Sequence, residues 1–113
     1  MKLFVYGTLR RAQAAHGLLR GARLVAHACT GPHYTLVDMG DYPAMVEVGT
    51  TSVAGEIYEV NEALLAELDA YEDAPALYER VVRRIEGHEV FVYLLPERHA
   101  LGRPRLPSGN WSR

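Results

Sequence analysis

The chain opens with a short apolar segment that leads directly into a glycine. Residues 2–6 read Lys-Leu-Phe-Val-Tyr, and Gly7, Thr8 and Leu9 follow. This pattern predicts a buried strand over residues 2–6 that ends in a tight loop, and ligands often gather where strands end. Because Gly7 lacks a Cβ atom, a substrate can approach the backbone there, and the N–H groups of residues 7–9 can converge on a carboxylate or carbonyl oxygen. A plain strand and turn explains the same residues, so both interpretations stay open.

Further short runs of apolar and β-branched residues, separated by glycine and proline, predict a sheet built mainly from hairpins. Strands are expected over residues 23–30, 33–38, 45–48, 53–60, 78–86 and 88–95. The remainder of segment 39–52 is expected to be loop. Gly87 marks the turn of the last hairpin.

Two segments favour helices. Residues 10–20 are rich in helix formers and end before a glycine. Asn61 is a good N-cap, and Leu64, Leu68 and Tyr71 follow it at helical spacing, which predicts a helix ending near residue 72. Together with the strands, these segments predict an α+β fold: a small mixed, mostly antiparallel β-barrel with two flanking helices.

The 113 residues are expected to form a single domain over 1–113, with an irregular C-terminal tail over 96–113 whose Trp111 folds back onto the body. A net charge of −2 favours neither nucleic acid nor an anionic membrane as a partner. The apolar run 90–95 is far too short to cross a bilayer. A single cysteine, Cys29, excludes an internal disulfide framework and is expected to fill a buried position. A cytoplasmic protein is the simplest inference.

The histidines do not have the spacing of metal ligands, so surface or turn positions are expected for them and no metal site is predicted. They are His16, His27, His33, His88 and His99.

Asp69 and Glu72 lie one helical turn apart at the end of the predicted second helix. A carboxylate near a helix C-terminus meets the negative end of the helix dipole, and partial burial acts in the same direction. Both effects raise its pKa, as a general base working near neutral pH requires. Two solvated acids on an exposed helix face are the alternative.

Several blocks occur in an order that closely resembles the γ-glutamylcyclotransferase-like family, particularly its small AIG2-like branch that includes γ-glutamylamine cyclotransferase. The blocks are Tyr6–Arg10, Gly55–Tyr58, Leu68–Glu72, Tyr78–Arg80 and a tail, Ser108–Trp111, like that of bacterial members. The resemblance covers nearly the whole chain. It implies a small mixed α/β barrel with the site at one end, and release of 5-oxoproline from γ-glutamyl compounds.

The resemblance also implies roles for individual residues. Glu72 matches the catalytic glutamate of the family, and Arg10 and Arg80 are candidate supports. The matches to the substrate-binding loop and pocket wall are Tyr6, Gly7, Thr8, Leu9 and Tyr78.

The chemistry suits these residues independently of the resemblance. A γ-glutamyl amide carries its own nucleophile, the α-amino group, so cyclisation requires no enzyme nucleophile, metal or cofactor. The protein must hold the cyclic conformer and move a proton, which one glutamate can do in both directions.

Two alternatives remain open at this point: a non-catalytic module that binds a small acid in the same pocket, and a related activity that removes a different acyl group. The partner in every case is a small molecule, here a γ-glutamyl substrate. The sequence determines neither the leaving amine nor the oligomeric state, and the segments 39–52 and 96–113 are expected to decide what fits beyond the glutamyl head.

Overall fold

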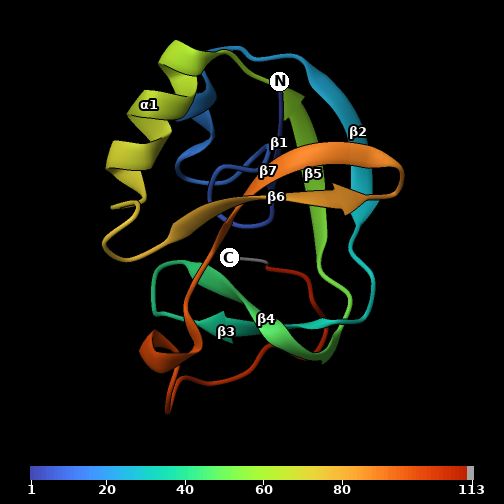
Figure 1. The fold of residues 1–113 in the computed structure, drawn as a ribbon, viewed down its shortest axis with the longest axis vertical. Helices are drawn as coiled ribbons and strands as arrows, with labels where there is room; N and C mark the ends of the chain where they lie inside the picture. The colour runs from blue at the N-terminus through green and yellow to red at the C-terminus, as the bar shows by residue number, and fades with distance from the viewer. Residues whose placement is uncertain (112–113) are drawn as a thin grey trace.

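The computed structural model describes residues 1–111 and contains seven strands, one α-helix and two short 3₁₀ helices within that range (Figure 1). The strands are β1 (Lys2–Val5), β2 (Leu24–Cys29), β3 (Tyr34–Asp38), β4 (Pro43–Thr51), β5 (Ala54–Glu59), β6 (Glu79–Ile85) and β7 (His88–Leu94). The helices are η1 (His16–Leu19), α1 (Glu62–Tyr71) and η2 (Glu97–His99). None of these helices has the length and apolarity that crossing a bilayer requires.

The strands form two sheets. Five strands pair in the order β2-β5-β1-β7-β6, and β3 pairs with β4 in a separate two-stranded sheet. The central strand β1 runs antiparallel to β5 and parallel to β7, while the other pairings are antiparallel. Figure 1 shows α1 beside the larger sheet and the β3–β4 pair toward the bottom of the view.

Strand β1 divides the core because successive side chains of a strand point to opposite faces. Leu3 and Val5 belong to the buried cluster that contains the leucines of α1. Phe4 and Tyr6 belong to a second cluster, which includes Met45 of β4. The loop that follows β1 therefore emerges where the larger sheet, the helix and the β3–β4 pair meet.

The predicted second helix is confirmed with nearly the expected bounds. The Asn61 side chain caps it by accepting a hydrogen bond from the Leu64 N–H at 2.8 Å. The helix ends at Tyr71, and Glu72 is its C-cap residue. The predicted hairpin at Gly87 is also present as β6 and β7.

The predicted helix over residues 10–20 is wrong, because this segment forms turns and only the four-residue η1. Ala12 has a φ of 68°, which no right-handed helix permits. Two hydrogen bonds that do not follow the helical pattern hold this segment instead. The Arg11 N–H donates to the Glu56 carboxylate at 2.8 Å, and His16 Nδ1 donates to the Leu9 carbonyl at 2.9 Å.

The barrel with two flanking helices is also a wrong prediction. The described strands form two sheets without a closed barrel, and α1 is the single α-helix among residues 1–111. The expected short strand at 45–48 is instead the nine-residue β4, which pairs with the whole of β3.

Two smaller predictions concern Cys29 and the tail. Cys29 is exposed rather than buried, because the alternation of β2 turns its neighbour Ala28 into the core. The tail is irregular apart from η2 and one isolated bridge between Val37 and Arg105, and Trp111 is buried as expected. The last two residues of the predicted tail lie outside the described residues.

Candidate active site

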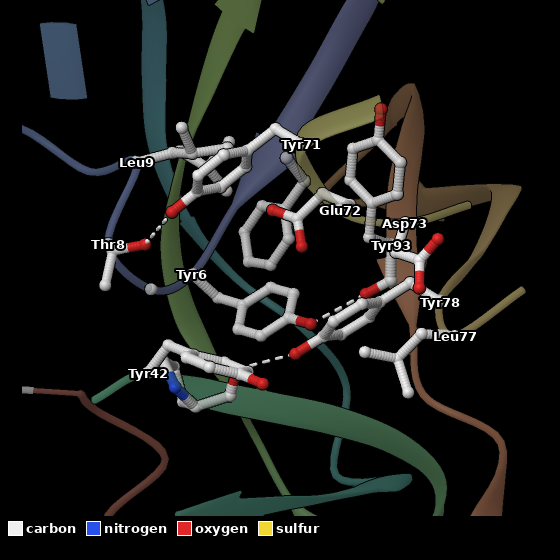
Figure 2. A pocket seen from close by; sticks show the side chains of 14 residues that line it. Tyr6, Thr8, Leu9, Tyr42, Tyr71, Glu72, Asp73, Leu77, Tyr78 and Tyr93 are labelled. Carbon is white, nitrogen blue, oxygen red and sulfur yellow. Dashed lines mark hydrogen bonds between the residues drawn. The ribbon is translucent and has the colours of Figure 1, made fainter. Parts of the chain in front are cut away.

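A cavity of about 230 Å³ lies at the end of β1 (Figure 2). Its walls come from five parts of the chain: β1 with its loop, the turn before β4, the end of α1, the segment that leads to β6, and β7. The volume is below the roughly 300–1,000 Å³ typical of sites for drug-sized ligands and suits a smaller molecule. The lining residues are Phe4, Val5, Tyr6, Gly7, Thr8, Leu9, Tyr42, Pro43, Tyr71, Glu72, Asp73, Leu77, Tyr78 and Tyr93.

Glu72 places a carboxylate among the aromatic rings of this cavity. Figure 2 shows its side chain surrounded by the rings of Tyr6, Tyr71 and Tyr93. The residue is half-buried, and within residues 1–111 no hydrogen bond or ion pair reaches the carboxylate. Desolvation by burial raises its pKa to about 7, because the apolar surroundings disfavour the charged form. The group is therefore poised to accept and return a proton near neutral pH.

Residues of the loop after β1 line the cavity, and their backbone groups differ in how they are hydrogen-bonded. Its three carbonyl oxygens are occupied: Gly7 accepts from the Arg10 N–H, Thr8 from the Ala15 N–H, and Leu9 from His16. By contrast, the N–H groups of Gly7, Thr8 and Leu9 donate to no acceptor in the part of the chain that the structure describes. Buried or half-buried amides normally have partners, so this arrangement suits an anion or a developing oxyanion in the cavity.

Two side chains that the sequence analysis did not assign to the site hold this loop. Glu56 of β5 is 8% exposed, accepts from the Arg11 N–H at 2.8 Å, and also accepts from the Tyr58 hydroxyl at 2.8 Å. His16 donates to the Leu9 carbonyl, and its ring lies 5.7 Å from that of Tyr58. The sequence could have pointed to Glu56, because it is an acidic residue within an apolar strand. A carboxylate buried there needs hydrogen-bond donors nearby.

Three tyrosine hydroxyls at the cavity are committed to structural hydrogen bonds. Tyr6 donates to the Tyr93 carbonyl at 2.7 Å and accepts from the Met45 N–H at 3.2 Å. Tyr78 donates to the Pro43 carbonyl at 3.2 Å, and Tyr93 donates to Asp69 at 2.7 Å. Burial raises the pKa of each phenol above its ordinary value. These hydroxyls stay protonated at neutral pH and fix the shape of the cavity.

All six residues predicted for the site line this one cavity, although their roles stay predictions. They are Tyr6, Gly7, Thr8, Leu9, Glu72 and Tyr78. The candidate supports Arg10 and Arg80 do not line it. Arg10 donates to the Gly7 carbonyl and to Asn110, and Arg80 pairs with Asp69 at 2.8 Å.

Two further tyrosines complete the cavity. Tyr42 belongs to the turn before β4, and it lines the cavity with 37% of its surface exposed. Tyr71 is 49% exposed and is not the core residue that its helical spacing predicts. Its hydroxyl instead lies 3.4 Å from the Thr8 hydroxyl, so the ring spans from the end of α1 to the loop (Figure 2).

Comparisons with known proteins place the chain in a family. The sequence model of the family described as "Gamma-glutamyl cyclotransferase, AIG2-like" matches residues 3–113. A Vibrio cholerae protein, whose name assigns it provisionally to the gamma-glutamylcyclotransferases, is 40% identical over 109 residues, which are 96% of this chain and 93% of that one. A human gamma-glutamylaminecyclotransferase is 39% identical over 93 residues, which are 74% of this chain and 61% of the human one.

A solved structure agrees with these matches. The crystal structure of an AIG2-like protein from Mus musculus superimposes with a TM-score of 0.82 and 31% sequence identity, over 95% of this chain and 86% of the mouse chain. The family match over nearly all residues, the two relatives and this shared fold agree with one another. The chain belongs to the gamma-glutamyl cyclotransferase, AIG2-like family.

Proposed function

We propose that this protein cyclises the γ-glutamyl group of a small γ-glutamyl amine or peptide to 5-oxoproline and releases the amine. One observation carries the proposal: an unpaired carboxylate with a pKa of about 7 and three backbone amides without acceptors in residues 1–111 line the same small cavity. The family membership and the name of the human relative support this chemistry.

The reaction requires a folded substrate and a proton carrier. The N–H groups of Gly7, Thr8 and Leu9 hold the α-carboxylate or the developing oxyanion of the glutamyl head. Deprotonated Glu72 takes a proton from the α-ammonium group, and the freed nitrogen attacks the γ-carbonyl carbon. The bond from that carbon to the amide nitrogen then breaks as Glu72 returns its proton to the departing amine. The ring nitrogen gives up its second proton, which Glu72 passes to the same amine, so the amine leaves as an ammonium ion and Glu72 is again deprotonated. Atoms and charges balance without a further reactant, and holding the cyclic conformer supplies the proximity effect.

The variant Glu72→Gln tests the role of the carboxylate. Glutamine keeps the side-chain shape but cannot carry the proton, so 5-oxoproline release is expected to fall by roughly 10²–10⁴-fold. The assay measures 5-oxoproline from a panel of glutathione, γ-glutamyl amino acids and γ-glutamyl-ε-lysine.

Glu89→Gln is the matched control, because Glu89 is exposed on β7 and does not line the cavity. Turnover that survives nearly intact in Glu72→Gln would remove Glu72 from the mechanism. Tight binding across the panel without turnover by the natural sequence would favour the non-catalytic binding module instead.

A further inference from the structure

Glu56 is a buried carboxylate that the proposed mechanism does not use. It is 8% exposed and does not line the cavity at the end of β1. No lysine or arginine among residues 1–111 forms an ion pair with it, and the exposed His27 comes no closer than 3.9 Å to Oε2. Burying a carboxylate without a matched cation costs stability, and a well-packed apolar side chain would avoid that cost. The reason for an acid at this position therefore lies in what its oxygens bind.

One oxygen of the Glu56 carboxylate makes both of its hydrogen bonds. Oε1 accepts from the Arg11 N–H and from the Tyr58 hydroxyl, each at 2.8 Å. Both donors are neutral groups. The oxygen of a side-chain amide also has two lone pairs and can accept the same two bonds. The arrangement therefore depends on how far the oxygen reaches and not on its negative charge.

Both ends of the loop after β1 are tied to Glu56. In the antiparallel pairing of β1 with β5, Glu56 lies opposite Val5, the last residue of β1. Its side chain holds the Arg11 N–H at the far end of the loop. Between these two points the chain makes a turn that the Arg10 N–H closes by donating to the Gly7 carbonyl at 3.1 Å. One residue of β5 thus sets the span of the loop.

This span contains the three amides that face the substrate in the proposed mechanism. The N–H groups of residues 7–9 have no acceptor within residues 1–111, whereas those of Arg10 and Arg11 are both taken. Donors that are fixed before the reaction stabilise a developing charge more strongly than donors that must first reorient. A displacement of about 1 Å in such a group can reduce a rate by about 10²-fold. The hold on Arg11 therefore bears directly on turnover.

We propose that Glu56 is a positioning residue for the cyclisation: through the Arg11 N–H it fixes the loop so that the amides of residues 7–9 meet the substrate. The proposal rests on the proposed function and adds a residue to it. Since the reach of Oε1 performs this task, the length of the side chain should matter more than its charge.

Two conservative variants separate length from charge. Glu56→Gln removes the charge but keeps an oxygen at the same reach, so kcat/KM for 5-oxoproline release should stay within about fivefold of the natural sequence. Glu56→Asp keeps the charge but is shorter by one methylene group, so the Arg11 N–H loses its acceptor and kcat/KM should fall by about 10²-fold. The substrate is the panel compound that the natural sequence cyclises fastest, and the assay temperature is one at which circular dichroism shows both variants to be folded.

Hydrogen exchange at the Arg11 amide gives a second readout that needs no turnover. In Glu56→Asp this amide should exchange about 10-fold faster or more, and the amide signals of residues 7–9 should shift in ¹H–¹⁵N spectra. Glu56→Gln should keep the exchange rate of the natural sequence. A general loss of stability would also speed exchange in β7, so a change confined to the loop identifies the local effect.

Glu59→Asp is the matched control. Glu59 lies on the same strand, and its carboxylate accepts from the N-terminal amine rather than from the loop. This variant should keep the natural kcat/KM. Natural activity in Glu56→Asp, or equal losses in Glu56→Asp and Glu56→Gln, overturns the positioning role and leaves the cyclisation intact. Absence of 5-oxoproline from every panel compound with the natural sequence overturns the proposed function, while the Arg11 exchange rate still reports whether Glu56 holds the loop.

Discussion

At Glu72 the proposed catalytic role and the stability of the fold make opposite demands on one residue. A base that works near pH 7 must lose much of its hydration, yet a half-buried carboxylate without partners in the described residues disfavours the folded state once it ionises. The raised pKa of Glu72 reports how strongly the folded state disfavours its ionised carboxylate. The same carboxyl in the unfolded chain ionises near the ordinary value of 4.5.

The conflict predicts a pH-dependent stabilisation by Glu72→Gln. Between pH 4.5 and about 7 the folded state binds more protons at Glu72 than the unfolded state, so stability falls as pH rises through this window. Above pH 7 the loss is complete and amounts to about 1–3 kcal/mol for a half-buried, partly screened group. Glutamine does not ionise, so Glu72→Gln should be more stable than the natural sequence at pH 8 and nearly equal at pH 4.5. Urea denaturation at both pH values measures this, and a pH-independent difference would contradict it.

Position 7 requires glycine because a neighbouring residue packs closely against its backbone, and its φ does not lie in the left-handed region. A Cβ atom at this position would lie 2.7 Å from Pro43 Cγ, the residue that begins β4. Gly7→Ala must therefore push the loop and β4 apart, with an expected loss of about 1–3 kcal/mol. Because the loop amides move, kcat/KM should fall by roughly 10-fold or more.

Gly17→Ala is the control for this substitution, since nothing lies within 4 Å of a Cβ there. It should leave kcat/KM unchanged and alter stability by less than about 1 kcal/mol. Thermal unfolding and steady-state kinetics on both variants give the comparison. If Gly7→Ala behaves like Gly17→Ala, the packing of the loop against Pro43 does not position the donors.

At the scale of elements, the end of α1 is what carries Glu72 to the cavity. Asp69 anchors that end: it accepts from the Tyr93 hydroxyl of β7 at 2.7 Å and pairs with Arg80 of β6 at 2.8 Å. The helix is thereby tied to two neighbouring strands one turn before Glu72. Asp69 does not line the cavity, so we expect it to act by positioning Glu72.

Asp69→Ala should therefore affect both stability and turnover. Loss of a part-buried ion pair and a hydrogen bond is expected to reduce the free energy of unfolding by about 1–3 kcal/mol. Since the carboxylate of Glu72 is then held less firmly, kcat should fall more than KM rises. Glu67→Ala, on the same helix, breaks the exposed pair with Arg20 and should change stability by only about 0–0.5 kcal/mol. Equal effects of the two substitutions would contradict the anchoring role.

The elements that could be predicted from sequence are those specified by local contacts. The helix from residue 62 has its cap at Asn61 and its leucines at helical spacing, so its signals lie within a few residues of one another. Residues 10–20 have helix-forming composition, but Glu56 captures the Arg11 N–H from 45 positions away. No local pattern reveals such a partner, and it outweighs propensity. The length of β4 likewise depends on its pairing with β3.

At the scale of the whole molecule, the cavity exists because distant segments converge on the end of β1. The ordered blocks of the sequence indicated which residues form the site, and all six predicted positions line the cavity. Their surroundings were not predictable: Tyr71 has the spacing of a core residue, yet it reaches across to Thr8. A helical period describes one face of a helix and does not reveal which neighbour that face meets near its end.

The C-terminal segment contacts β5 and the loop that follows β1. Figure 1 shows the red C-terminal segment, up to residue 111, running between the two sheets. The Gly109 carbonyl accepts from the Ala54 N–H of β5 at 2.8 Å, and Asn110 accepts from Arg10 at 2.9 Å. Trp111 is 2% exposed, so the tail contributes this side chain to the core although most of its described residues are exposed.

This packing predicts that Trp111→Ala is among the most damaging substitutions outside the cavity. Removing a buried indole typically reduces stability by about 3–5 kcal/mol, a large share of the roughly 5–15 kcal/mol that holds a domain together. Asn110→Ala, which removes an exposed hydrogen bond next to it, should reduce stability by no more than about 0.5–1.5 kcal/mol. Urea midpoints of the two variants at one pH provide the measurement. A loss below about 1 kcal/mol in Trp111→Ala would mean that the indole is not a core residue, because a side chain with this little exposed surface cannot be removed without leaving a void.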